Sequence, residues 1–395
     1  KPVMDACEHF GIAEYVEPDF KIVRGLAYYT GPVWEIFDRE RALRAVAGGG
    51  RYDQLIGSLG GPDLDVDAIF RIQSMTKPVT TVATLRLVDR GLIKLDDPVA
   101  RWLPELADPV VLSHPDAPLD DTRPSPRPIT VRHLLTNTSG YGMMTTDSPL
   151  AQAMVESGLE AGPQPSGLGA DEWLARAASL PLAFAPGEGW RYHHSFGILG
   201  VLISRVVGRS TPDHVREDLL APLGMVDTGF WTPSASAHRL PATYRRDGDV
   251  LVESEPAGGG LYAGPPAHDV SHEELVSTVA DYARFLRALS YGTEVGDGPL
   301  VSAELLKLMT SDQIPDALKR PDSFFPGFWD QMGWGFGVGV QTGGGHAGRF
   351  GWSGGLGTDF FVDPDGTIGI LLAQVDLDEQ VMALFNEFQQ LVPPH

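Results

Sequence analysis

Hydrophobic and polar positions follow a clear helical period after the stretch IFRIQSMTKPVT. Apolar residues recur at three-residue steps through residues 79–88, which places them on one face of a helix and predicts that this face contacts a core. Charged residues within 86–90 fall on the other side. Pro78 lies in the first turn, where its missing N–H would have no intrahelical partner. The pattern predicts an amphipathic helix that begins close to Ser74.

Further helical patterns dominate residues 105–255, with Pro and Gly at the joints. We expect helices at residues 128–137, 171–180, 196–207 and 212–220. Toward the C-terminus, short runs predict the strands of an antiparallel sheet at residues 334–341, 349–354, 358–362 and 367–374, with a turn at 363–366. Two stretches rich in Pro and Gly, residues 143–169 and 262–271, are expected to be loops near the mouth of a site.

Composition excludes several classes of protein. The 395 residues are 43% hydrophobic, which is enough for a large core in one domain or two joined ones. A net charge of −22 repels phosphate backbones and anionic lipids, so neither nucleic acid nor membrane is an expected partner. No long apolar run or signal-peptide pattern is visible, and a cytoplasmic location is expected. The single cysteine, Cys7, excludes an intramolecular disulfide framework.

Ser74 and Lys77 are the first candidates for chemistry. Residues three apart share a helix face, so the hydroxyl and the amine point the same way, as a nucleophile and its base would. A lysine acts as a base at neutral pH only if its pKa falls from about 10.4 to about 7, which takes roughly 4.6 kcal/mol of desolvation and positive potential. On these two residues alone, a capping serine beside a solvated lysine remains an equal alternative.

Longer stretches strengthen the catalytic interpretation. They include IFRIQSMTKPVT, LIKLDDPVARWLPE, ITVRHLLTNTSG, LAFAPGEGWRYHHSFGILG and GRFGWSGGLGTDFFVDPDGT. In order and in kind they resemble the serine β-lactamase and penicillin-recognising hydrolases, especially class C β-lactamases and family VIII carboxylesterases, over about residues 66–390. The resemblance implies an α+β fold of the β-lactamase/penicillin-binding transpeptidase type. One α/β lobe would comprise residues 63–105 and 256–395, with an antiparallel sheet flanked by helices, and residues 106–255 would form an all-helical lobe.

The same resemblance implies roles for single residues. Ser74 and Lys77 match the serine-x-x-lysine element, which implies the nucleophile and its base. Tyr192 matches the tyrosine of the tyrosine-x-asparagine element, which implies a phenol that shares the proton of Lys77 and passes it to the leaving group. His194 stands where lactamases carry asparagine, and this departure puts the recognition of a β-lactam side chain in doubt.

A further departure lies in the family's lysine-threonine-glycine strand, which is represented here by Trp352, Ser353 and Gly354. The next residue, Gly355, aligns with the one whose N–H completes an oxyanion hole with the N–H of Ser74. Lactamases of the family place a cation or an imidazole at the Trp352 position. An indole offers an apolar wall and one N–H donor, which suits neutral esters better than the carboxylate of a penicillin.

The first sixty residues have a different character. The stretches ACEHFGIAEYVEPDFKIVRGLAYYTGPVWEIF and AGGGRYDQLIGSLGGP resemble histidyl-tRNA synthetase over about residues 4–62. Ala27 replaces an aspartate of that family's pattern, and its ATP-binding and glycine-rich arginine motifs are absent, so aminoacylation is not expected. We expect a helix at 5–15, strands at 33–37 and 43–47, and a turn at 38–41. The hypothesis is a chimera, joined near 62–67, in which residues 1–62 complete the sheet of the hydrolase lobe; a separate docking module is the alternative.

These features together predict a serine hydrolase. We expect it to cleave carboxylic esters with short to medium acyl chains through a covalent acyl-enzyme and a Ser-Lys-Tyr centre. β-Lactamase or D-alanyl-D-alanine carboxypeptidase activity is one alternative, and a non-catalytic binding or scaffold protein is another. The partner would be a small-molecule ester or a β-lactam-like compound, and the oligomeric state is not indicated. No cofactor is expected, and no metal, because His193 and His194 should point apart and His346 lacks H-E-x-x-H spacing.

Overall fold

The computed structural model describes residues 33–36, 47–50, 64–162, 166–267, 271–292 and 298–392. The chain forms two compact units, Lys1–Asp63 and Leu64–His395. In the first unit, strands β1 (Val33–Ile36) and β2 (Ala47–Gly50) pair antiparallel. The predicted first strand is confirmed, whereas the predicted second strand shares only Ala47 with β2. The predicted helix at 5–15 and turn at 38–41 lie outside the described residues, and the idea that residues 1–62 complete the hydrolase sheet stays a prediction.

The second unit contains a five-stranded antiparallel sheet, ordered β13-β12-β11-β10-β9. Its strands are β9 (Met332–Trp334), β10 (Gly339–Gln341), β11 (Phe350–Gly351), β12 (Thr358–Val362) and β13 (Ile368–Leu372). The turn at 363–366 is confirmed, since Gly366 N–H donates to the carbonyl of Asp363. The single strand predicted at 334–341 is wrong: the chain reverses there, with Gly337 at a φ of +72° and Gly335 N–H bonded to the carbonyl of Val338.

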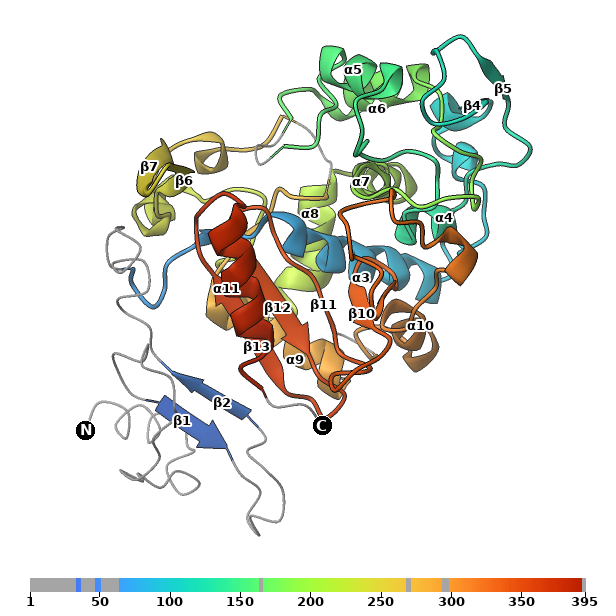
Figure 1. Cartoon of the computed structure of the whole chain (residues 1–395). Coiled ribbons are helices and arrows are strands. Elements are labelled where there is room, and N and C mark those ends of the chain that lie inside the picture. Colours follow the sequence, from blue (N-terminus) through green and yellow to red (C-terminus); the bar gives the residue numbers. More distant parts are fainter. Residues whose placement is uncertain are drawn as a thin grey trace. The chain divides into compact units, whose positions relative to one another are not determined.

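Two helices cover opposite faces of this sheet. Phe360 and Phe361 are neighbours on β12, so their side chains point to opposite faces. Phe360 contacts Tyr282 of α9 (Val279–Tyr291), with ring centroids 5.4 Å apart, and Phe361 contacts Phe388 of α11 (Glu379–Gln389) at 5.2 Å. Figure 1 shows α11 lying across one side of β12 and β13. The sheet is therefore the middle layer of this part of the unit.

The helix that carries Lys77 runs through the interior. It consists of a 3₁₀ turn, η2 (Gln73–Met75), followed directly by α3 (Thr76–Asp89), and the predicted helix is thereby confirmed. The predicted polar, exposed face is wrong, because α3 is buried on nearly all sides. Arg86 is only 8% exposed, and it donates to Asp218 and to the carbonyl of Leu300. A charged residue with partners inside the fold has the same sequence appearance as a solvated one, which explains the error.

Helices lie at or near the four ranges predicted within residues 105–255, and an additional one lies at residues 149–156. They are α4 (Val131–Leu135), α5 (Pro149–Glu156), α6 (Ala170–Ser179), α7 (His194–Val207), α8 (Thr211–Val215) and the π-helical η5 (Arg216–Leu220). Two hairpins that the pattern did not predict also lie here: β4 (Val110–Leu112) with β5 (Thr122–Pro124), and β6 (Thr243–Asp247) with β7 (Val250–Glu255). The predicted loop at 143–169 contains α5, which Ser148 caps. In Figure 1, α4 to α7 gather with β4 and β5.

Short elements complete the unit. Strands β3 (Phe70–Arg71) and β8 (Val276–Ser277) pair beside the start of η2. The others are α10 (Ala303–Met309) and the 3₁₀ turns η3 (Val99–Arg101), η4 (Pro104–Leu106), η6 (Ser234–Arg239), η7 (Leu261–Ala263) and η8 (Asp316–Leu318). Among the residues that the structure describes, no helix has the length and apolar character needed to cross a bilayer.

The sheet meets the turn that carries Ser74 at Gly354. A Cβ atom on Gly354 would lie 2.5 Å from the carbonyl oxygen of Ile72 and 2.3 Å from Oγ1 of Thr358. Thr358 Oγ1 itself donates to the Ile72 carbonyl at 3.1 Å. The absence of a side chain at this position is what lets the two segments come so close.

We predict that Gly354→Ala destabilises the protein by about 1–3 kcal/mol, because the added methyl group must push backbone apart. Denaturant unfolding of the purified variant measures the change. Gly264→Ala is the matched control, since a Cβ there meets nothing within 4 Å. Equal stability of the two variants would contradict the close approach described above.

Candidate active site

A strained turn presents Ser74. The preceding residue, Gln73, is buried and has a left-handed φ of +50°, which is uncommon for a residue with a side chain. Its amide donates to the hydroxyl of Tyr262 at 2.8 Å, and the carbonyl of Met75 accepts from Tyr282 at 2.9 Å. Hydrogen bonds on both sides of Ser74 therefore hold the turn in this conformation.

Lys77 meets the requirement that the sequence placed on it. Its side chain is fully buried, and Nζ lies 2.9 Å from Oγ of Ser74 and 2.7 Å from the carbonyl oxygen of His272. Burial lowers the pKa of Lys77 to about 7, against an opposing effect of Glu273 and Glu274. Near neutral pH a large fraction of the amine is uncharged, with a lone pair beside the serine hydroxyl. The alternative of a solvated lysine is wrong.

Tyr192 joins the same centre. Its phenol oxygen accepts a 2.5 Å hydrogen bond from Nε1 of Trp352. Nζ of Lys77 lies 4.6 Å from the centroid of the tyrosine ring, over its face. Burial raises the pKa of Tyr192, so the phenol keeps its proton. The amine of Lys77 thus contacts both the hydroxyl of Ser74 and the ring of Tyr192, whose protonated phenol is available as a proton donor.

Trp352 has a role that the sequence did not reveal. Its one N–H is engaged by Tyr192, and its ring packs edge-on against Trp334 with centroids 4.6 Å apart. Both belong to an aromatic cluster made by Trp190, Tyr192, Phe324, Phe328, Trp329, Trp334 and Trp352. Trp352 therefore supports the phenol as well as forming an apolar wall.

The predicted binding residues Gly355, Gly354 and Ser353 differ in whether their polar groups already have a partner. A Cβ on Gly355 would lie 3.8 Å from Oε1 of Gln73, so Gly355 is beside the Ser74 turn, and its oxyanion role stays a prediction. Gly354 N–H is already used by the carbonyl of Thr358. The hydroxyl of Ser353 donates to the buried Asp359 at 3.0 Å, so it is engaged by β12 and not by Ser74 or Lys77.

His194 contacts Leu159 and Trp173 and not the catalytic residues. Nε2 of His194 is 2.6 Å from the carbonyl oxygen of Leu159, and its ring stacks on Trp173 with centroids 6.4 Å apart. Burial lowers the pKa of His194 to about 4, so the ring is neutral. The expectation that His193 and His194 point apart is wrong, because the two residues lie at the start of α7 and not in a strand, and their ring centroids are 5.2 Å apart.

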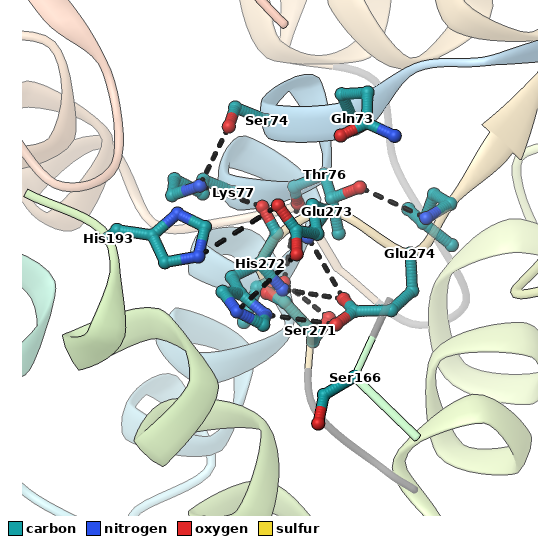
Figure 2. A network of polar contacts seen from close by, with 12 residues as sticks. Gln73, Ser74, Thr76, Lys77, Ser166, His193, Ser271, His272, Glu273 and Glu274 are labelled. Carbon is teal, nitrogen blue, oxygen red and sulfur yellow. Dashed lines mark hydrogen bonds and ion pairs between the residues drawn. The ribbon is translucent and has the colours of Figure 1, made fainter. Parts of the chain in front are cut away.

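Sequence reasoning missed the polar network behind Lys77, drawn in Figure 2. It consists of His193 together with Ser271, His272, Glu273 and Glu274. The run His-Glu-Glu directly after the Pro- and Gly-rich stretch 262–271 was the local sequence signal for it. Nothing in the sequence connects this run with His193, because the packing of the fold alone brings them together.

Comparison with known proteins agrees with this geometry. A profile of the beta-lactamase family matches residues 40–384, and a profile of histidyl-tRNA synthetase matches residues 3–64. Protein Rv1367c of Mycobacterium tuberculosis is 34% identical over 359 residues, covering 87% of this chain and 84% of the relative. Esterase EstB of Burkholderia gladioli is 31% identical over 338 residues, covering 79% and 78%.

Solved structures share the fold. EstCE1, described as a hydrolase with promiscuous acyltransferase activity, has a TM-score of 0.67 at 22% identity and covers 83% of this chain and 86% of its own. A LovD6 mutant of simvastatin synthase from Aspergillus terreus has a TM-score of 0.65 at 23% identity, covering 84% and 83%. A penicillin-binding protein from Bacillus halodurans has a TM-score of 0.59 at 19% identity. The predicted α+β fold of the β-lactamase type is confirmed.

We predict that Trp352→Phe slows covalent labelling of Ser74 by a fluorophosphonate about two- to tenfold. The variant keeps an aromatic ring but loses one hydrogen bond to Tyr192, which is worth about 0.5–1.5 kcal/mol. Gel-based labelling over time measures the rate.

Trp329→Phe is the control for that experiment. Trp329 belongs to the same aromatic cluster, but its N–H donates to Ser323 and not to Tyr192. An equal loss of labelling rate in both variants would show that packing, and not the hydrogen bond to the phenol, is responsible.

Proposed function

The chain belongs to the beta-lactamase family, and from this we propose that it is a serine hydrolase that cleaves carboxylic esters with short to medium acyl chains. The observation that carries the proposal is the buried amine of Lys77, 2.9 Å from the hydroxyl of Ser74 and with a pKa of about 7. A base with a pKa near the working pH is the most effective general catalyst.

The reaction proceeds in two halves. Neutral Lys77 takes the proton of Ser74 as Oγ attacks the ester carbonyl, and the N–H groups of Ser74 and Gly355 stabilise the resulting oxyanion. As the C–O bond to the alcohol breaks, Tyr192 donates its proton to the leaving oxygen, and the acyl group remains on Ser74. Lys77, which holds the proton taken from Ser74, then gives it to the phenolate of Tyr192 and becomes neutral again.

The second half repeats these steps with water. A water molecule that gives its proton to the Lys77 and Tyr192 pair attacks the acyl carbonyl, the bond to Oγ breaks, and the proton returns to Ser74. The products are the carboxylic acid and the regenerated enzyme. Ser74, Lys77 and Tyr192 are all buried, and Lys77 is hydrogen-bonded to Ser74, which supports proton transfer among these groups.

The wall at Trp352 favours neutral esters over β-lactams. The only donor of the indole is engaged by Tyr192, so this position offers an anionic substrate no charge and no free N–H. The aromatic cluster around it provides an apolar surface for an acyl or alkyl group. β-Lactamase or D-alanyl-D-alanine carboxypeptidase activity is the runner-up, because the family includes such enzymes.

We predict that the purified protein hydrolyses p-nitrophenyl esters with short to medium acyl chains faster than it opens a chromogenic cephalosporin. Ser74→Ala should abolish ester turnover, since Ser74 supplies the nucleophile that forms the acyl-enzyme. Steady-state kinetics on both substrate classes, with circular dichroism to check the fold of the variant, measures this. Retained turnover by a folded Ser74→Ala variant would refute the assignment, and a faster reaction with the cephalosporin would favour the runner-up.

The pH profile tests Lys77. Because only its neutral form accepts a proton, kcat/KM for a neutral ester should rise with pH through about 7, the pKa that burial gives this amine. Lys77→Ala should reduce kcat/KM at least about a hundredfold at pH above that value. The exposed Lys307 supplies the control variant Lys307→Ala, which should keep both the rate and the profile. A rate independent of pH in this range would contradict the role of Lys77.

A further inference from the structure

Two histidines and one glutamate lie together behind the catalytic lysine. His193 is the N-cap residue of α7, whereas His272 and Glu273 come from the segment that precedes β8. Nε2 of His193 is 3.8 Å from Oε2 of Glu273, and Nε2 of His272 is 3.9 Å from Oε1 of Glu273. One ligand atom from each residue lies within 4.8 Å of the others. Figure 2 shows the two rings approaching the carboxylate of Glu273 from different sides.

The distances between the ring nitrogens and the carboxylate oxygens distinguish a hydrogen-bonded cluster from one with the spacing of metal ligands. At 3.8 and 3.9 Å, nitrogen and oxygen are too far apart for a direct hydrogen bond, which needs about 2.7–3.2 Å. Ligands at about 2.0–2.1 Å from a tetrahedral zinc ion are roughly 3.3 Å from one another. The cluster is therefore more open than a hydrogen-bonded network and within a small side-chain rotation of metal-ligand spacing.

Glu274 orients His272 as a supporting carboxylate does in metal sites. Oε1 of Glu274 lies 2.9 Å from Nδ1 of His272, which leaves Nε2 of that ring directed to Glu273. The other oxygen of Glu274 accepts the backbone N–H groups of His272 at 2.8 Å and Glu273 at 2.9 Å. A histidine that binds metal commonly has a carboxylate beside its second ring nitrogen, as Glu274 lies beside Nδ1 of His272.

The backbone of His193 is strained. Its φ of +94° and ψ of −77° are close to the classic γ-turn, a conformation that is rare for a residue with a side chain. This geometry turns the His193 ring toward His272, with centroids 4.3 Å apart, while the next ring, His194, points to Leu159. Strain of this kind persists where the surrounding structure holds a residue in a working position.

The three side chains line a cavity of about 360 Å³, together with Leu159, Trp173 and His194. His193, His272 and Glu273 are each no more than 5% exposed, so a bound ion would exchange its water shell for protein ligands and would still have room for one solvent ligand. Glu273 and Glu274 bring two carboxylates into the interior, and a divalent cation would offset their charge.

We propose that His193, His272 and Glu273 bind a single zinc ion, with Glu274 as the supporting carboxylate. Two imidazoles and one carboxylate suit a borderline cation such as Zn²⁺ and are a poor match for Mg²⁺ or Ca²⁺, which prefer oxygen ligands. The site does not depend on the proposed esterase activity, because none of its ligands takes part in acyl transfer.

Calorimetric titration of the EDTA-treated, full-length Ser74→Ala variant with zinc chloride tests the proposal in a protein that cannot turn over ester. We expect one saturable equivalent of Zn²⁺, with affinity at least about a hundredfold weaker in His193→Gln and in His272→Gln, each made in the same background. Glu274→Gln should weaken binding about 10–100-fold, as loss of a supporting carboxylate does. Magnesium chloride should give no such binding.

His214→Gln is the matched control, because His214 is equally buried but lies outside the cluster. X-ray absorption at the zinc edge of the unsubstituted protein, with one equivalent of metal, should show two imidazole nitrogens at about 2.0–2.1 Å and a carboxylate oxygen, and it decides the question if a ligand variant fails to fold. Absence of saturable binding, a spectrum without imidazole, or unchanged affinity in folded His193→Gln and His272→Gln variants would overturn the proposal.

Discussion

The candidate site depends on the desolvation of the Lys77 amine, which lowers its pKa enough for it to act as a base. Lys77 lies on a helix that is buried on nearly all sides, and among the described residues its amine is hydrogen-bonded to two oxygens, the hydroxyl of Ser74 and the carbonyl of His272. The cost of keeping a charge there is what shifts the pKa to about 7. The interior position of α3, between the sheet and the helical region, is therefore a chemical requirement as well as a packing solution.

Local sequence patterns predicted the elements in which apolar residues recur in a regular pattern. Strand β12 is found at the residues expected for it, and the periodic apolar positions of α3 and α7 produced helices close to their predicted bounds. The split of 334–341 into β9 and β10 was not predictable from alternation, because Gly335 and Gly337 permit a reversal that the flanking apolar residues hide. Arg86 was assigned to an exposed face because periodicity shows only that a residue is polar. It does not show whether the fold supplies a buried hydrogen-bond partner.

The candidate site shows the same division. Ser74, Lys77 and Tyr192 were identified from motifs, and in the fold the amine of Lys77 contacts both other side chains. The bond between Trp352 and Tyr192 and the meeting of His193 with Glu273 were beyond the sequence, since each joins segments that are distant along the chain. Ser353 illustrates the opposite case, in which a residue belongs to the right motif but its hydroxyl serves the sheet.

Three main-chain groups of the segment 271–275 hydrogen-bond to α3, beside one side-chain contact between Ser271 and Thr80. Thr80 donates to the carbonyl of Ser271, Lys77 to that of His272, and Oγ1 of Thr76 accepts from the N–H of Leu275. A peptide group is the same whatever residue carries it, so this anchorage does not specify the side chains along the segment. Substitutions along this segment can therefore change the polar groups behind Ser74 while the main-chain hydrogen bonds to α3 are kept.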